Sequence, residues 1–205
     1  MAPSAAPTRS AGRQRDGRTD AALIDAVLDL VGRGATLSGI SFVAIAEHAG
    51  VSRNSLYRRW KTKDALYLDV LASLNRPLPA LAGTSVLDDV AELLAVIIER
   101  SVDPRASQML RALNAEASKF PQLHRRYFEE VVAPRRAVLI DLLERGVERG
   151  DIVNDVDVDF AASVLVAPIL TSVAFNMTQD LDPKVTSRQI ADLVFAGLSP
   201  RPTVD

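Results

Sequence analysis

The residues from Ser52 to Lys63 include many side chains that can donate hydrogen bonds to another molecule. Arg53 can donate two hydrogen bonds to a guanine edge, Asn54 can pair with an adenine edge, and Ser55 suits either base. The next residues are of types that contact nucleic-acid phosphates: Tyr57, Arg58, Arg59, Lys61 and Lys63. This pattern predicts a helix that reads base edges while its flank binds the backbone. For Arg59, an ordinary surface position is the alternative.

The preceding segment predicts a short helix that ends at a tight turn. Its apolar residues recur at the i, i+3, i+4, i+7 spacing of one helix face; they are Phe42, Ile45, Ala46 and Ala49. Ser41 is placed to cap the N-terminus of this helix, and Gly50 accepts the left-handed backbone conformation that the turn needs. Val43 lies on the outward side, where it either contacts a thymine methyl group or packs.

A second helix follows the turn. Ser52 can cap it, and Leu56 and Trp60 are directed inward from a helix of about residues 53–60. Two helices held at a fixed angle in this way form a helix-turn-helix, whose second helix enters the major groove of DNA. We therefore predict binding to double-stranded DNA, with Ser41, Val43 and Ser52 added to the predicted contacts.

The run from Ile45 to Leu66, IAEHAGVSRNSLYRRWKTKDAL, resembles the DNA-binding core of the tetracycline-repressor-like (TetR/AcrR) transcriptional regulators. That pattern is roughly Ile-Ala-x-x-Ala-Gly-Val-Ser-x-x-(Thr/Ser)-Leu-Tyr-x-x-Phe-x-x-Lys-x-x-Leu. Trp60 stands where the family usually has Phe, and Val43 where it more often has a polar residue. The resemblance implies phosphate contacts by Tyr57 and Lys63, and a dimeric repressor that responds to a ligand.

Charge and composition agree with this interpretation. The formal net charge of −2 conceals a segregation, because residues 1–64 carry ten basic and six acidic side chains while the remainder carries fourteen and twenty. A cationic N-terminal part is expected where that part meets phosphates. The absence of cysteine excludes disulfides and cysteine chemistry. Neither a long apolar stretch nor a signal-peptide core occurs, so we expect a cytoplasmic protein without a membrane partner.

The N-terminal part divides into an arm and a three-helix domain. Residues 1–17 are rich in Ala, Pro, Ser, Gly and Arg without periodicity, which indicates a disordered basic arm. Its arginines either reach DNA or belong to a solvated tail, and Arg18 next to it joins the predicted DNA contacts. A helix from Thr19 or Asp20 to about Val31 supports the helix-turn-helix pair and completes a DNA-binding domain over residues 18–62.

Residues 63–205 predict an all-α ligand-binding and dimerisation domain without strands. The expected helices span residues 63–74, 85–101, 104–119, 121–149, 160–177 and 185–198. The first of them joins the two domains and is expected to transmit motion, and Pro134 predicts a kink. The last two carry more apolar surface than one chain can obviously cover. The resemblance implies that a second copy covers it in a four-helix bundle, which gives a homodimer.

A pocket between helices of the second domain is the expected site for a small, mainly apolar effector of unknown identity. The candidates, most of which could equally be core residues, are Met109, Leu113, Asn114, Phe120, Tyr127, Phe128, Pro168, Phe175 and Asn176. No cofactor or metal is expected. Asp155, Asp157 and Asp159 lack the Gly and Glu of a calcium loop and fit a helix N-terminus better.

Two other classes of protein remain as alternatives. A helical small-molecule-binding dimer without specific DNA binding would not need Tyr57, Arg58 and Lys63. A helical enzyme is disfavoured because His48 and His124, the only histidines, have no evident nucleophile or metal partner. We predict a ligand-responsive repressor that binds a pseudo-palindromic operator as a dimer. Whether the effector releases or promotes DNA binding stays open.

Overall fold

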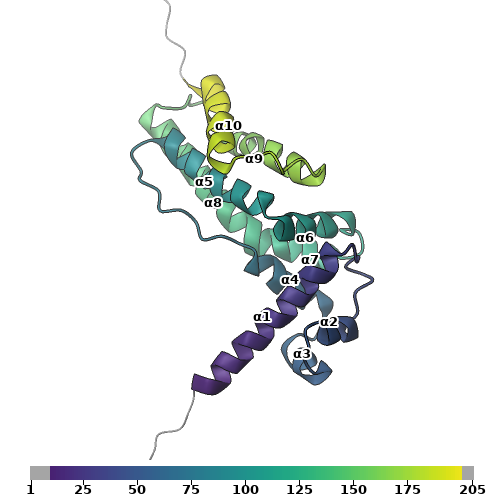
Figure 1. The fold of residues 1–205 in the computed structure, drawn as a ribbon. Coiled ribbons are helices and arrows are strands. Elements are labelled where there is room, and N and C mark those ends of the chain that lie inside the picture. Colours follow the sequence, from purple (N-terminus) through teal and green to yellow (C-terminus); the bar gives the residue numbers. More distant parts are fainter. Residues whose placement is uncertain (1–9, 200–205) are drawn as a thin grey trace, which may run out of the picture.

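The computed structural model describes residues 10–199, with side chains from residue 17 onward. Within this range the chain is all-α, as predicted, and no residue lies in a strand. Three helices form one end of the molecule (Figure 1): α1 (Ser10–Gly32), α2 (Phe42–His48) and α3 (Arg53–Arg59). The helix α4 (Lys63–Ser73) connects them to the rest of the chain.

The other helices form an elongated second domain above this end in Figure 1. They are α5 (Val86–Val102), α6 (Pro104–Ala115), α7 (Pro121–Tyr127), the π-helical turn η1 (Phe128–Val132), α8 (Ala133–Arg149), α9 (Val158–Ala174) and α10 (Pro183–Leu198). None of the helices in residues 10–199 is long and apolar enough to span a membrane.

Side-chain caps start the helices of the helix-turn-helix where the sequence predicted. Ser41 Oγ accepts a hydrogen bond from the Ala44 amide at 3.0 Å, and Ser52 Oγ accepts one from the Ser55 amide at 3.2 Å. Gly50 has a φ of 65°, the left-handed conformation that ends α2. Because these local signals agree with one another, the angle between α2 and α3 is well determined by the sequence.

The N-terminal arm is shorter than predicted. α1 begins at Ser10, so residues 10–17 are its first two turns and not part of a disordered arm. Once the apolar residues nearer Val31 have anchored a helix, each added residue gains a backbone hydrogen bond, and an outer turn needs no apolar periodicity. Residues 1–9, the rest of the predicted arm, lie outside the described residues.

Two of the predicted helices in the second domain differ most from the structure. α6 ends at Ala115, four residues early, because Glu116 leaves the helix to bind the loop before α2. The single helix expected from Pro121 to Arg149 is divided into α7, η1 and α8. Pro134 has no N–H, and the hydrogen-bond ladder just before it changes to π-helical spacing, which is where the sequence predicted a kink.

The buried residues form two apolar cores. One combines α1–α4 with α6, α7 and η1, and its fully buried members include Leu23, Leu56 and Met109. The other joins α5, α8, α9 and α10 around Leu94 and Leu165. Since α6 and α7 share a core with the helix-turn-helix, a shift of these helices must disturb the packing of α4.

A polar joint reinforces the contact between the α1–α2 loop and α6. The Glu116 carboxylate accepts a hydrogen bond from the Ser38 amide at 2.9 Å and another from the Ser38 hydroxyl, and it pairs with Lys119 at 2.8 Å. Beside it, the Tyr67 hydroxyl donates to the Leu37 carbonyl at 2.8 Å. Burial raises the pKa of Tyr67, so this hydroxyl stays a donor.

We expect Glu116→Gln to lower the free energy of unfolding by about 1–3 kcal/mol, because charge-assisted bonds to Lys119 and Ser38 are lost. Those bonds lower the pKa of the Glu116 carboxyl from 4.5 to about 2. The unfolded chain therefore binds the proton more tightly, and this stabilisation is complete above pH 4.5 and is lost as the pH falls to about 2. Chemical denaturation across this range should show a smaller acid loss in the variant; equal losses would contradict the role of Glu116.

Candidate DNA-binding surface and effector site

The helix α3 presents a polar face to solvent. Arg53 and Asn54 in its first turn are exposed, Ser55 is half-buried, and Tyr57 is 48% exposed. On the opposite side, Leu56 is fully buried, so the helix cannot rotate without losing core contacts. The structure thus brings Arg53 and Asn54 together on one outward surface, as the sequence predicted.

Contacts with α2 and α4 fix the orientation of this face. The Tyr57 ring packs edge-on against Phe42 with centroids 5.2 Å apart, and Arg53 Nη2 lies 3.0 Å from Glu47 Oε1. Trp60, which ends α3, is buried and donates from its indole nitrogen to Asp69 Oδ2 at 2.7 Å. The hydrogen bond to Asp69 suits the indole that replaces the usual Phe, since a buried Trp N–H needs an acceptor.

The predicted phosphate-binding residues surround the same surface. Arg58 is exposed on α3, Lys61 Nζ donates to the Tyr57 carbonyl at 2.9 Å, and Lys63 Nζ donates to the Ser38 carbonyl at 3.0 Å. A lysine ammonium has three donors, so both lysines keep protons for a phosphate. Of the other predicted contacts, Ser41 and Ser52 are exposed caps, Val43 is half-buried on α2, and Arg18 is exposed in the first half of α1.

Arg59 is not part of this surface, contrary to the prediction that it contacts phosphate. Its side chain is only 12% exposed, and its Nε donates to Asp20 of α1 while Nη1 donates to the Ser55 carbonyl at 3.0 Å. The physical reason is helical geometry, because position 59 lies on the side of α3 that faces Asp20 of α1. Arg59 therefore attaches α3 to α1.

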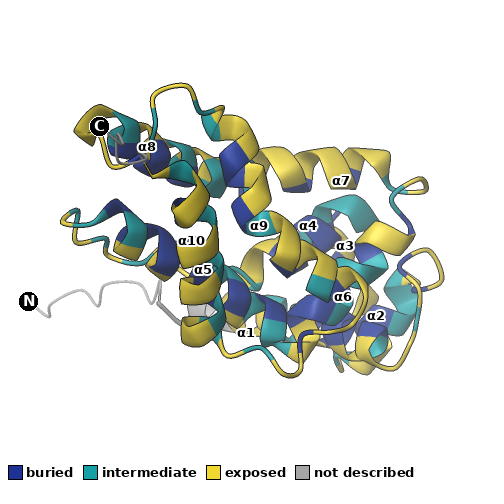
Figure 2. Ribbon diagram, turned by 90° about the horizontal axis from the view of Figure 1, so that it is seen from above, coloured by how far each residue is buried: buried dark blue, intermediate teal, exposed yellow. Residues whose placement is uncertain are grey.

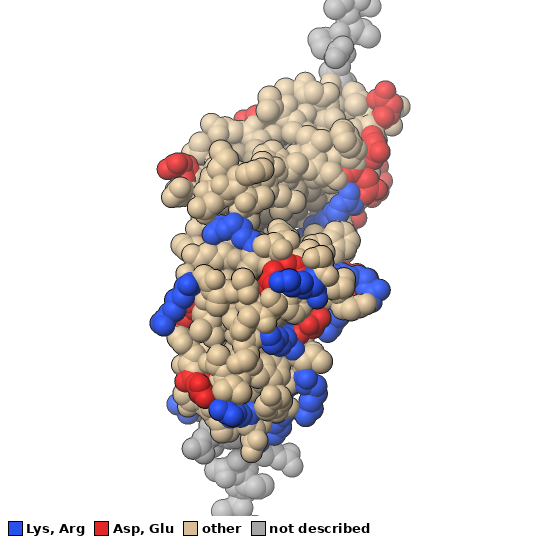
Figure 3. Space-filling view, turned by 90° about the vertical axis from the view of Figure 1, so that its right-hand side faces the viewer, with Lys and Arg blue, Asp and Glu red and all other residues tan. Residues whose placement is uncertain are grey.

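The charge distribution separates the two ends of the molecule. On the side shown in Figure 3, Lys and Arg gather over the middle and lower parts together with some acidic side chains, whereas the upper end is largely uncharged and its few charged side chains are mainly acidic. The lower part corresponds to the end of the molecule that contains the helix-turn-helix in Figure 1. This arrangement directs the cationic end towards a polyanion such as DNA.

The nine predicted effector-binding residues do not form one pocket. Met109 and Leu113 are fully buried core residues, Phe120 packs on Tyr67, and Tyr127 is also buried. Exposed positions hold the others: Asn114, Phe128, Pro168, Phe175 and Asn176. The set fails as a pocket because large apolar residues serve cores and interfaces as often as ligand sites, and spacing along the sequence does not separate these uses.

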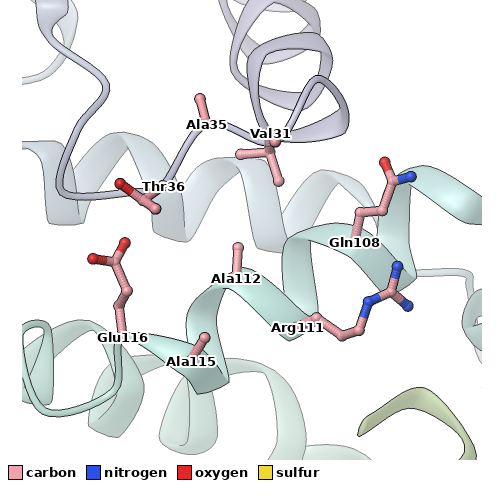
Figure 4. Close-up of a pocket in the computed structure, with 9 residues that line it drawn as sticks. Val31, Ala35, Thr36, Gln108, Arg111, Ala112, Ala115 and Glu116 are labelled. Carbon is pink, nitrogen blue, oxygen red and sulfur yellow. The ribbon is translucent and has the colours of Figure 1, made fainter. Parts of the chain in front are cut away.

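An open pocket of about 300 Å³ lies elsewhere, between the segment after α1 and the helix α6 (Figure 4). None of the nine predicted residues lines it. Its lining consists of Val31, Gly34, Ala35, Thr36, Gln108, Arg111, Ala112, Ala115 and Glu116. In Figure 4, Ala112 and Glu116 point up from α6 towards the segment that carries Ala35 and Thr36. The pocket thus lies at the joint between the helix-turn-helix end and the second domain.

Sequence reasoning missed a pair of arginines in the second domain. Arg100 of α5 has Nε and Nη2 buried without a hydrogen-bond partner, and Arg135 of α8 is half-buried near it. The sequence does indicate that Arg100 is unusual, because position 100 follows the buried Leu93 by seven residues. This spacing places the arginine on the apolar face of α5. An arginine on such a stripe is a candidate for binding an anion.

The last two helices expose apolar side chains that a single copy leaves uncovered (Figure 2). Leu193 on α10 is 79% exposed, and Phe175 at the end of α9 is 73% exposed. Further exposed apolar residues on or beside these helices are Phe160, Val164, Leu170, Met177 and Val185. Such a patch on two neighbouring helices is typical of a protein interface.

An exposed cationic helix on a helix-turn-helix, joined to an all-α second domain, defines a class of DNA-binding protein. The profile "Tetracyclin repressor-like, C-terminal domain" matches residues 83–198, and the profile "Bacterial regulatory proteins, tetR family" matches residues 37–70. The chain belongs to the TetR family, and it is a ligand-responsive DNA-binding transcriptional regulator.

Individual relatives agree with this assignment. The chain is 28% identical over 161 residues to the "Uncharacterized HTH-type transcriptional regulator YdeS" of Bacillus subtilis (strain 168), covering 77% of this chain and 79% of YdeS. NalD, the secondary repressor of the MexAB-OprM multidrug efflux pump in Pseudomonas aeruginosa, has a similar solved structure (TM-score 0.68, 19% identity, 91% and 98% of the two chains). So does the fatty acid degradation regulator FadR from Bacillus halodurans (TM-score 0.68, 16% identity, 86% and 98%).

Proposed function

We propose that this chain is a transcriptional repressor that binds a pseudo-palindromic operator as a homodimer. The observation that carries the proposal is the outward, cationic first turn of α3, where Arg53 and Asn54 are exposed beside Tyr57. A helix presented in this way fits the major groove of DNA. Acting on DNA implies a cytoplasmic location, and we propose a regulatory and not a catalytic role for the whole chain.

Within this surface, the side chains have two tasks. Arg53, Asn54 and Ser55 contact base edges, and Val43, half-buried on α2, adds an apolar contact with a thymine methyl group. Phosphates are bound by a second set, which sets register and affinity without reading sequence. That set comprises Arg18, Ser41, Ser52, Tyr57, Arg58, Lys61 and Lys63. Before DNA binds, Arg53 pairs with Glu47. Breaking this ion pair costs free energy and so reduces the net affinity for DNA.

The homodimer forms through α9 and α10. Their exposed apolar residues, led by Phe175 and Leu193, lie on helices that also contact each other within one chain. Two such pairs from two copies make a four-helix bundle and bury this surface. A two-fold axis between the copies presents two α3 helices to two half-sites in opposite orientation, which is why the operator is pseudo-palindromic.

A small, mainly apolar effector bound in the second domain lowers the affinity for the operator. It acts only through a difference in its affinity for the DNA-bound and DNA-free conformations. The route runs through α4, which follows the helix-turn-helix directly and shares a core with α6 and α7. A shift of α6 or α7 then changes the separation of the two α3 helices.

The test is selection of bound sequences from a pool of random duplexes, with the double variant Arg53→Ala, Tyr57→Ala as control. We expect enrichment of a palindromic sequence by the unmodified protein and no enrichment by the variant. Failure to enrich any sequence across a range of salt concentrations would contradict specific DNA binding. It would favour the alternative, a helical dimer that binds a small molecule without reading DNA.

A further inference from the structure

The guanidinium of Arg100 lies inside the second domain without the partners that a buried charge needs. Its Nε and Nη2 atoms are buried and have no hydrogen-bond acceptor, and its central carbon lies 5.6 Å from the centroid of the Tyr127 ring. The Tyr127 contact satisfies one face of the guanidinium but none of the N–H groups in its plane. Unpaired donors of a charged group are costly to bury, so this arrangement calls for an acceptor.

A second arginine adds to the positive charge at the same place. Arg135 Nη1 donates to the Val131 carbonyl at 3.3 Å and Nη2 to the Arg76 carbonyl at 2.7 Å, so its partners are backbone groups. Burial lowers the pKa of Arg135, and the charge of Arg100 lowers it further. In the described part of the chain, no carboxylate forms an ion pair with either arginine.

The groups that contact the two arginines in the described part of the chain are a tyrosine ring and backbone carbonyls. Tyr127 of α7, whose ring faces the Arg100 guanidinium, and Val131 of η1 are buried in the same core. The segment directly after α4 supplies the Arg76 carbonyl, and the adjacent Asn75 has a buried Oδ1 without a hydrogen-bond partner. Two cations, one of them with its Nε and Nη2 donors unpartnered, form a site that an anion on an apolar molecule would complete; the Asn75 oxygen is itself an acceptor and takes no part in binding the anion.

We propose that the effector carries an oxyanion, a carboxylate or a phosphate, which is bound by Arg100 with Arg135 beside it. The planar fork of a guanidinium pairs with two oxygens of either group, and the Arg100 Nε and Nη2 donors are the two that lie on one edge of that fork. This inference rests on the proposed function, since it specifies the chemistry of the effector.

The same geometry explains how binding of an anion at Arg100 would affect the DNA-binding end of the molecule. Arg135 donates to the carbonyl of Arg76, which lies three residues after Ser73, the end of α4. An anion at Arg100 competes with that carbonyl for the Arg135 donors. Binding therefore loosens the attachment of the segment after α4 to α8, and α4 carries the helix-turn-helix.

The test compares thermal unfolding of the full chain, without DNA, in the presence of matched compounds. The probes are naphthoate, naphthyl phosphate and naphthol, together with decanoate, decyl phosphate and decanol, at constant ionic strength. We expect the acids, and not the alcohols, to raise the Tm of the unmodified protein, because only the acids supply acceptors for Arg100. Comparing the increase in Tm with the carboxylates to the increase with the phosphates identifies which oxyanion the site prefers.

Arg100→Met keeps an unbranched apolar stem and removes the guanidinium with its charge. Without ligand we expect its Tm to rise by roughly 2–4 °C, since the unpaired donors are gone. Calorimetric titration should show acid binding weakened by about 10–100-fold. Arg145→Met removes a charge from α8 whose guanidinium bonds only to the Asp141 carbonyl of its own helix, and it should respond as the unmodified protein does.

Three results would overturn the proposal: no acid in the panel stabilises the unmodified protein, alcohols stabilise it as well as acids do, or Arg100→Met keeps normal acid binding. Should Arg100→Met fail to fold, Arg100→Gln provides the same comparison with a neutral donor. Because DNA is absent from these measurements, loss of specific DNA binding in the selection experiment would leave this outcome unaffected.

Discussion

Leu193→Asp is expected to convert the homodimer into a monomer. The Leu193 side chain is 79% exposed in the single chain, so the substitution should change the stability of the monomer by no more than about 0.5 kcal/mol. In the proposed bundle, the same position places a carboxylate against apolar side chains of the second copy, where it is neither hydrated nor paired. Sedimentation or light scattering gives the mass directly.

Loss of the dimer should also weaken binding to a palindromic operator by about 100-fold or more, because each half-site is then bound without the effective concentration that linkage provides. Leu78→Asp is the matched control. It places the same charge on an exposed leucine in the connection between α4 and α5, away from α9 and α10, and should leave a dimer with normal affinity. A dimeric Leu193→Asp protein would show that the copies meet through another surface.

Arg53→Ala is expected to reduce operator affinity by about 100-fold or more. One good contact between a side chain and a base edge contributes about 1–3 kcal/mol of discrimination, and a dimer makes the contact twice. The substitution also frees Glu47, whose carboxylate then faces DNA without its partner. Fluorescence anisotropy with the selected operator measures the loss, and binding should become less selective at the base pair that Arg53 contacts.

Arg145→Ala supplies the comparison for charge alone, since it removes one positive charge from α8 in the second domain. Its operator affinity should stay within about twofold, because exposed charges farther apart than a Debye length are largely screened. Equal losses in the two variants would mean that Arg53 acts through net charge. No loss in Arg53→Ala would remove this residue from the base-reading set.

The helix-turn-helix could be predicted from the sequence because its signals are local. Ser41 and Ser52 cap the helices that follow them, and Gly50 takes the left-handed conformation, each within a few residues of the group it affects. The two final helices were also predictable from their apolar pattern. The excess of apolar residues on them, more than one chain covers, indicates an interface. Patterns of this kind specify a helix and one of its faces without knowledge of the tertiary contacts.

Features that depend on distant contacts were not predictable in the same way. The cationic neighbours of Arg59 predict a phosphate contact, whereas the structure pairs it with Asp20 in α1. Met109 and Leu113 were candidates for an effector pocket and are core residues, because α6 packs on the helix-turn-helix end. The early end of α6 depends on Ser38, 78 residues away from Glu116. Long-range pairings of this kind are specified by packing of the whole chain.

If two copies of α3 read two half-sites, as proposed, the protein must distinguish an operator with two half-sites from an operator with one. The affinity of the unmodified protein is measured for the selected palindrome and for the same duplex with one half-site scrambled, at one salt concentration. We predict that the scrambled duplex binds at least about 100-fold more weakly, since one reading helix loses its base contacts. Equal affinities for the two duplexes would contradict a dimer that reads a palindrome.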